Sequence, residues 1–187
     1  MRVSSIAAAS LLVITTAAAR DSATEREIAE RVFDGRKSFD AFRSASHVTA
    51  ERLHCKTPGI CISSSLADYR QDSPRSLSVG QVEQLRNLFS RHDSYSPDLW
   101  RLKPRQFDLK ACGVEYGVLF TFHSVPEVRI ALCFKCDEFG VFVGTHDHSE
   151  HVNRGTELSF MRSRLIPLIK SIYPHDSQIQ NLPLKRP

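Results

Sequence analysis

The stretch Cys112–Gly144, CGVEYGVLFTFHSVPEVRIALCFKCDEFGVFVG, decides the fold. Apolar residues alternate with other residues over positions 114–122, which is the period of a strand with one buried face. Pro126 marks a turn because it lacks the N–H that a strand ladder needs. Alternation resumes over positions 128–135, and a second turn precedes a short strand at 141–143. The sequence therefore predicts a three-stranded antiparallel meander.

The flanking segments supply the other elements. Residues 47–54 have an extended pattern, which predicts a strand able to join the same sheet. Residues 56–76 are rich in Ser, Pro and Asp and are expected to form a surface loop. Ser78 and Gln81 have the spacing of a capping box at the start of an amphipathic helix. A second amphipathic helix is predicted over residues 156–173.

These elements predict a single α+β domain. A lone small sheet buries too little apolar surface, so we expect helices packed mainly on one face of an antiparallel meander. The expected organisation is a signal peptide at residues 1–19, a helical lead-in at 20–45, the domain at 46–182 and a tail at 183–187.

Composition limits the class of protein. The chain has 187 residues, of which 41% are hydrophobic and 25% are charged, as in an ordinary globular protein with one core. The formal net charge is +4, and the basic residues are scattered rather than clustered. No nucleic-acid partner is expected on this basis.

The N-terminus has the pattern of a secretory signal peptide. Arg2 precedes an apolar run at residues 6–14, and Ala17–Ala19 provides an A-x-A cleavage pattern. Cleavage after Ala19 would make Arg20 the first residue of an exported protein, either periplasmic or extracellular. No membrane span is expected in the mature chain.

Five cysteines form two groups in the sequence. Cys55 and Cys61 flank a turn-like loop, and Cys112 precedes the close pair Cys133 and Cys136. In an oxidising compartment the first interpretation is structural, as disulfides or a buried thiol. A zinc site with Cys112 as the third ligand is the second interpretation. A redox dithiol at the close pair is the third.

A histidine-rich segment follows the predicted meander. His146, His148 and His151 are close enough to converge on one metal ion if the chain curls. The string H-x-H-x-E-H resembles the H-x-H-x-D-H signature of the metallo-β-lactamase superfamily, whose zinc ions activate a hydroxide. Glu150 stands where that family has Asp, and the family's fold needs more chain than this protein has. A polar loop without a chemical task is the leading interpretation, and metal binding at this loop is the alternative.

Other catalytic patterns are missing from the sequence. It contains no G-x-S-x-G elbow, P-loop, H-E-x-x-H helix or Gly-rich dinucleotide turn. His47, His54 and His123 are interpreted as surface residues. No catalytic or cofactor-binding residue is therefore predicted beyond the candidate metal ligands.

A wider pattern spans most of the mature chain. It combines a strand, a Leu-rich helix ending in Ser-Tyr, a lone Cys, a Cys-Phe-x-Cys and a helix ending in Tyr-Pro-x-Asp. Its positions, in chain order, are Val48, Ala50, Arg52, Leu85, Leu88, Ser94, Tyr95, Cys112, Cys133, Phe134, Cys136, Tyr173, Pro174 and Asp176. This order resembles a group of uncharacterised exported bacterial proteins. The resemblance implies the domain limits of about 46–182 and groups Cys112 with the Cys-Phe-x-Cys.

Three function classes follow from the sequence. The first is a non-enzymatic exported domain used for binding or envelope structure. The second is a metal-binding protein with zinc at the Cys112, Cys133 and Cys136 group or at the His146, His148 and His151 group. The third is a thiol-redox protein that uses the C-x-x-C pair.

Overall fold

The structure is a computed structural model that describes residues 24–57, 66–101, 115–144 and 150–185. Side chains are described in these ranges except over residues 150–156. The predicted signal peptide and residues 145–149 of the histidine segment lie outside the described residues.

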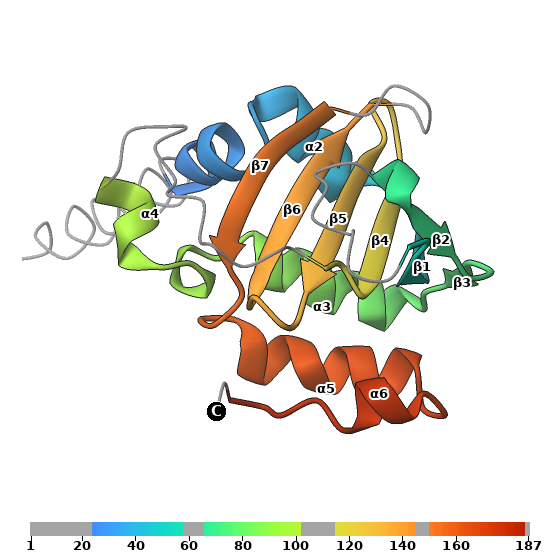
Figure 1. Ribbon diagram of the computed structural model, residues 1–187. Helices are drawn as coiled ribbons and strands as arrows, with labels where there is room; N and C mark the ends of the chain where they lie inside the picture. The colour runs from blue at the N-terminus through green and yellow to red at the C-terminus, as the bar shows by residue number, and fades with distance from the viewer. Residues whose placement is uncertain (1–23, 58–65, 102–114, 145–149, 186–187) are drawn as a thin grey trace, which may run out of the picture.

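One antiparallel sheet organises the described chain (Figure 1). Its strands stand in the order β2-β1-β4-β5-β6-β7, and β3 pairs with β1 beside β2. The strands are β1 (His47–Cys55), β2 (Tyr69–Gln71), β3 (Arg75–Ser76), β4 (Val118–His123), β5 (Val128–Cys133), β6 (Glu138–Val143) and β7 (Glu150–Glu157). Strands β4 to β7 form a meander, and β1 joins that meander along β4.

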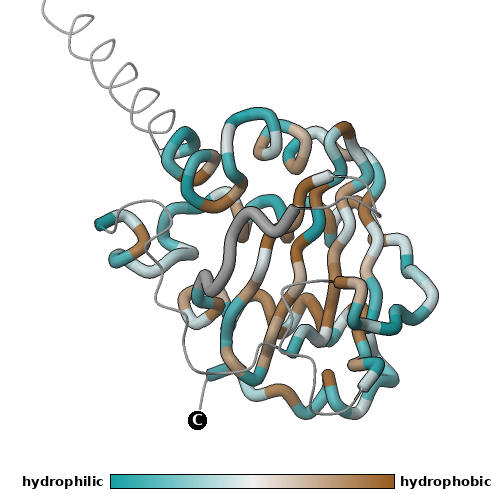
Figure 2. Tube along the Cα trace, turned by 45° about the horizontal axis from the view of Figure 1, so that its top comes forward, coloured by the Kyte–Doolittle hydropathy of each residue, from teal (hydrophilic) through white to brown (hydrophobic). Residues whose placement is uncertain are grey.

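Side-chain alternation gives the sheet two different faces. On β4, Val118, Phe120 and Phe122 belong to the main core, whereas Leu119 belongs to a second cluster. The same parity holds on β5, where the main core receives Val128, Ile130 and Leu132. The period-2 pattern of the sequence is therefore the physical origin of both faces. Figure 2 shows hydrophobic residues concentrated along the central strands and hydrophilic residues toward the periphery.

Helical segments supply the other side of the main core. They are the helix at residues 24–32, α2 (Arg36–Ser44), α3 (Val79–Phe89), α4 (Pro97–Arg101), α5 (Arg162–Ile172) and α6 (Ser177–Gln180). Short 3-10 turns occur at Leu66–Asp68 and His92–Ser94. In Figure 1, α2 and α3 lie behind the sheet, and α5 and α6 lie below α3. Core residues from α2, α3 and α5 share one cluster with the sheet.

The N-terminal helical segment packs into the main core. Ile28, Val32, Phe33, Phe39 and Phe42 are all fully buried there. The Phe42 ring lies 4.7 Å from the Phe122 ring of β4, centroid to centroid. Residues 28–42 thus share their core with the sheet.

The predicted fold class is confirmed: the protein is α+β with an antiparallel, meander-like sheet. The strand expected at residues 47–54 is present as β1, and it joins the meander. The helix expected at Ser78 is α3, and the capping box between Ser78 and Gln81 is complete. These elements were predictable because their signals are local.

Three boundaries differ from prediction. Residues 56–76, expected as a loop, include β2 and β3, which pair with β1. The third strand is longer than expected, because Asp137 adopts a left-handed backbone (φ 59°) that places the turn before Glu138. The helix expected from Thr156 begins at Arg162 instead, since residues 150–157 pair with β6 as β7.

Within the described ranges, no helix is both long enough and apolar enough to cross a membrane.

Candidate functional site

Two histidine side chains meet at one end of the sheet. His47 begins β1 and His123 ends β4, and the antiparallel register sets them directly opposite each other. Their rings are nearly parallel, with an interplanar angle of 18° and centroids 4.7 Å apart. Both residues are exposed, so the pair is open to solvent.

Hydroxyl and carboxylate groups hold the two rings. Nε2 of His47 lies 3.3 Å from Oγ of Ser76 in β3. Nε2 of His123 lies 3.0 Å from Oγ1 of Thr49, and Nδ1 lies 3.4 Å from Oε2 of Glu127. An ionised carboxylate only accepts, so the hydrogen of neutral His123 belongs on Nδ1 and Thr49 donates to Nε2. We call these five residues the histidine end of the sheet.

A buried arginine supports the carboxylate of this group. Arg129 on β5 is only 2% exposed, and its Nε lies 3.5 Å from Oε1 of Glu127. Burial lowers the pKa of Arg129, while the nearby carboxylates of Glu127 and Glu51 act in the opposite direction. An arginine remains protonated at neutral pH even so. It therefore balances the charge of Glu127 and helps to fix that side chain beside His123.

The chain Thr49–His123–Glu127 has the connectivity of a hydroxyl, a base and an orienting carboxylate, as in nucleophilic enzymes. Thr49, however, is mid-strand, paired with Ser76 on one side and Thr121 on the other. It is also only 5% exposed. The arrangement thus presents imidazoles to solvent rather than a nucleophilic hydroxyl.

The ring geometry also bears on metal binding at the pair. Imidazole nitrogens coordinate a metal in the plane of the ring. The planes of His47 and His123 are stacked and nearly parallel, so their nitrogen lone pairs do not converge on one point. Hydrogen bonding and charge are the interactions that this pair offers to a ligand.

The C-x-x-C pair is divided between two chemical states. Cys133 is a free thiol and fully buried, whereas Cys136 is disulfide-bonded, as is Cys55. Burial raises the pKa of the Cys133 thiol, and the hydrogen bond from the Cys136 N–H, 3.2 Å from Sγ, opposes that rise only in part. A raised pKa lowers the thiolate fraction at neutral pH. Cys133 thus has the character of a buried structural thiol.

For most of the other predicted metal ligands, the structure describes no side chain. Cys112, His146 and His148 lie outside the described residues, and His151 lies in β7, where side chains are not described. In the described part of the chain, no three or more His, Cys, Asp or Glu side chains form a group suited to a metal ion. The zinc interpretation stays a prediction, and a disulfide-bonded Cys136 would not serve as a thiolate ligand for it.

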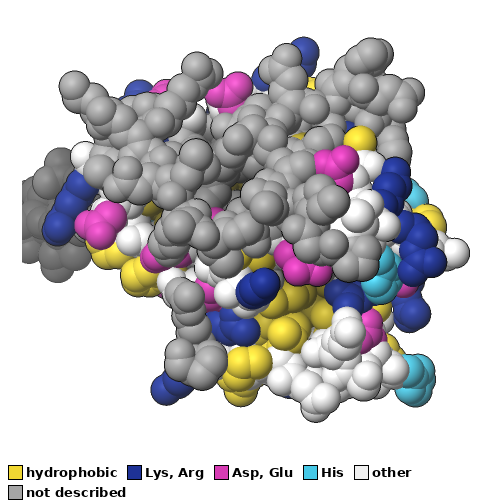
Figure 3. Space-filling model, in the orientation of Figure 1, with side chains coloured by type: hydrophobic (Ala, Val, Ile, Leu, Met, Phe, Trp, Pro, Cys, Tyr) yellow, Lys and Arg dark blue, Asp and Glu magenta, His cyan; other side chains and the backbone are white. Residues whose placement is uncertain are grey.

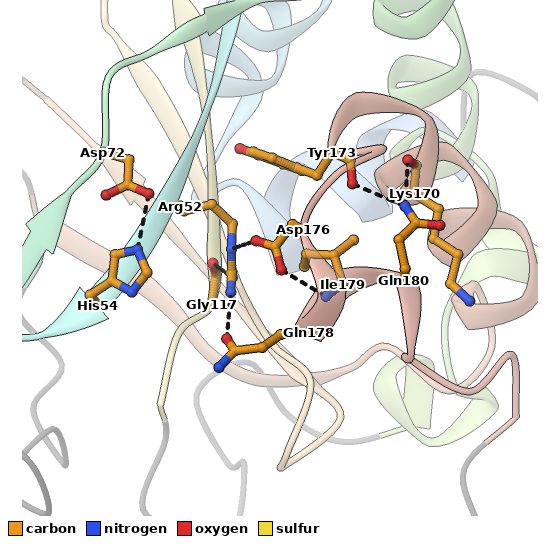
Figure 4. Close-up of polar contacts among 10 residues, drawn as sticks. All are labelled: Arg52, His54, Asp72, Gly117, Lys170, Tyr173, Asp176, Gln178, Ile179 and Gln180. Atoms are coloured by element: carbon orange, nitrogen blue, oxygen red, sulfur yellow. Dashed lines mark hydrogen bonds and ion pairs between the residues drawn. The ribbon is translucent and has the colours of Figure 1, made fainter.

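A second polar group joins β1 to the C-terminal helix (Figure 4). Nε of Arg52 donates to Oδ2 of Asp176 at 2.7 Å, and Nη2 donates to Oε1 of Gln178 at 3.0 Å. Nη1 donates to the carbonyl of Gly117, where a Cβ would stand 3.2 Å from that same nitrogen. Asp176 also caps α6 by accepting from the Ile179 N–H at 3.0 Å. These contacts use all three guanidinium nitrogens and hold the fold together.

Sequence reasoning missed both polar groups. His47 and His123 were interpreted separately as surface residues, because nothing local indicates that they face each other. Their meeting depends on the register of β1 against β4. One signal could have found the pair. The sequence predicts that the strand at residues 47–54 joins the meander, and few strands of the meander are open to pair with it, β4 among them.

Comparison with known proteins places the chain in no family: no family model, curated protein or solved structure matches it.

Proposed function

We propose that the protein is an exported binding domain without a catalytic step of its own, and that the histidine end is its binding surface. One observation carries the proposal. Two solvent-exposed imidazoles stand 4.7 Å apart and are fixed by groups of neighbouring strands. Side chains that are both exposed and held in place bind a ligand with little loss of conformational entropy.

The state of the other reactive groups supports binding over catalysis. The one free thiol described, Cys133, is buried and has a raised pKa, unlike the exposed thiolate of a redox enzyme. The hydroxyl of Thr49 is also buried. The histidine pair is exposed, and both of its rings have hydrogen-bonding partners.

Two features support export. Residues 1–19 have the charge, apolar core and A-x-A ending of a signal peptide. Cys55 and Cys136 are disulfide-bonded, a state that persists in oxidising compartments.

Histidine-selective NMR tests the binding surface. The protein, with its histidine rings carbon-13 labelled, is titrated with panels of neutral, cationic and anionic small molecules. We expect at least one class to shift the His47 and His123 ring signals while those of His175, an exposed residue near α6, stay in place. His47→Gln should abolish that response, whereas the matched change His175→Gln should preserve it. Ligands that shift neither ring, or that shift all histidines alike, would contradict the proposal.

A further inference from the structure

We infer that the histidine end is an acid-dependent site for a small oxyanion such as sulfate or phosphate. This inference rests on the proposed function and specifies its ligand class and regulation. It follows from the charges that face the pair and from the change in hydrogen-bonding roles when the imidazoles gain protons.

The site gains positive charge on acidification. The charged groups at the pair are Glu127 before β5, which lies 3.4 Å from His123, and Arg129 on β5, which interacts with Glu127 and with Glu51 of β1. On β3, Arg75 is directed instead over the ring of Tyr173. With both imidazoles neutral, the charges of Glu127 and Arg129 cancel. With both imidazoles protonated, the local charge is positive.

Stacking makes the doubly protonated pair receptive to an anion. Two like charges at this spacing repel each other, and the ladder between β1 and β4 keeps the two residues on opposite positions of neighbouring strands. Of the two histidines, His123 is the one that lies at an ion-pair distance from Glu127. An oxyanion against the exposed ring edges supplies the opposite charge that His47 lacks.

Protonation also adds hydrogen-bond donors to the site. The Nε2 of protonated His123 becomes a donor, and Thr49 accepts from it, while the Thr49 hydroxyl itself stays buried. Protonated His47 donates from Nε2 to Ser76 and carries a hydrogen on Nδ1 as well. The exposed imidazolium donors match the acceptor oxygens of sulfate or phosphate.

A basic edge of the molecule attracts anions at long range. Figure 3 shows Lys and Arg side chains gathered at the right edge of the molecule, with histidine side chains beside them. This is the edge at which β1, β2 and β3 lie in Figure 1. Arg70 on β2 is exposed at this edge, and it pairs with His54, near the opposite end of β1 from His47. Such a potential raises the local concentration of anions, and added salt weakens it.

Sulfate is the probe of choice, because its charge stays at −2 across the relevant pH range while that of phosphate does not. Calorimetric titration of the full chain at constant ionic strength should give an affinity roughly tenfold higher at pH 5 than at pH 7.5. In the presence of sulfate, the NMR midpoints of His47 and His123 should move to higher pH, since the bound anion favours the protonated rings.

Variants separate the site from general attraction. His47→Gln and His123→Gln should each remove the pH dependence, whereas His54→Gln, which alters an exposed histidine paired with Asp72, should retain it. Acetate in place of sulfate should bind more weakly, because it carries one charge. Equal sulfate affinity at both pH values, or pH-dependent affinity that survives in the His47→Gln/His123→Gln double variant, would overturn the inference.

The outcome also separates this inference from the proposed function. If sulfate fails but another ligand shifts the two ring signals, the ligand class is wrong and the binding surface stands. If no ligand in any panel shifts them, both fail. Circular dichroism of each variant at pH 5 verifies that the change in affinity does not come from unfolding.

Discussion

His123 and Cys133 show how the surroundings of single residues decide their chemistry. Both end a strand of the same sheet, and both are residue types that enzymes use. His123 is exposed at its strand end and hydrogen-bonded, so it can meet a ligand. Cys133 is fully buried in the second cluster, beside a disulfide-bonded neighbour, so it cannot. The exposure of each side chain, which the sequence does not reveal, decides which of the two residues can contact a ligand.

The burial of Cys133 gives a prediction about thiol reactivity. In the native protein at pH 7.5, iodoacetamide should label Cys133 at least tenfold more slowly than it labels glutathione, because the thiol is inaccessible and its pKa is raised. Mass spectrometry of peptides follows the labelling with time. The same reagent in guanidinium chloride serves as control and should label Cys133 fully. Labelling of the native protein as fast as glutathione would instead favour the redox interpretation of the C-x-x-C pair.

Much at the residue scale could not be predicted from the sequence. The capping box at Ser78 was predictable, since its two partners are three residues apart. The histidine pair was not, because His47 and His123 are distant in the chain and meet only through strand register. The contact between Arg52 and Asp176 was not predictable either, because the two residues lie 124 positions apart in the chain.

At the scale of elements, local patterns identified the strands that bury one face. The alternation in β4 and β5 is strong because every second side chain of each strand is buried in the main core. β7 escaped prediction since the residues 150–157 (EHVNRGTE) alternate poorly and pair at the end of the sheet. β2 and β3 are too short to carry a periodic signal. Pairing, rather than propensity, creates these three strands.

The link between β1 and α6 gives a prediction about stability and pH. Burial alone would raise the pKa of Asp176, but hydrogen bonds from the Ile179 N–H and from Arg52 lower it overall. A carboxylate with a lowered folded-state pKa stabilises the fold above its unfolded pKa of about 3.9, and that contribution is lost as the pH falls through the folded value. Asp176→Asn keeps a residue that caps helices well and removes only the charge.

We expect Asp176→Asn to lower the free energy of unfolding by about 1–2 kcal/mol at pH 7, because the buried Arg52 loses its counter-charge. The difference from the wild type should shrink below pH 4, where Asp176 gains its own proton. Urea denaturation at pH 7, 4 and 3 measures it. Asp72→Asn, at an exposed carboxylate paired with His54, should change stability by less than about 0.5 kcal/mol. Equal effects of the two variants would contradict the role given to Asp176.

At the scale of the whole molecule, one core joins segments from both ends of the described chain. Ile28 near the start and Ile179 near the end belong to the same cluster as the sheet. The opposite face carries a smaller cluster that contains Cys133 and Cys136, with Cys55 packed against it. Disulfides near the smaller cluster stabilise a face with fewer apolar contacts.

The proposed export gives a prediction for the whole chain. When the full sequence is expressed in a Gram-negative host, the protein recovered from the periplasm should begin at Arg20, as N-terminal sequencing will show. Under denaturing, non-reducing conditions, an alkylating agent should label Cys133 but leave Cys55 and Cys136 unlabelled. Expression without residues 1–19 is the control and should give reduced, labelled cysteines in the cytosol. Protein that keeps Met1 and stays in the cytosol would contradict export.

The antiparallel contact between β1 and β4 has a consequence for the order in which the protein is made. β1 pairs locally with β2 and β3, and β4 to β7 pair as consecutive hairpins, so each half can close soon after its own synthesis. The seam between the halves is the pairing of β1 with β4, and His47 and His123 face each other across it. The proposed ligand surface therefore requires both halves. We expect a nascent or truncated chain not to bind the ligand until β1 has paired with β4 and the two halves form one sheet.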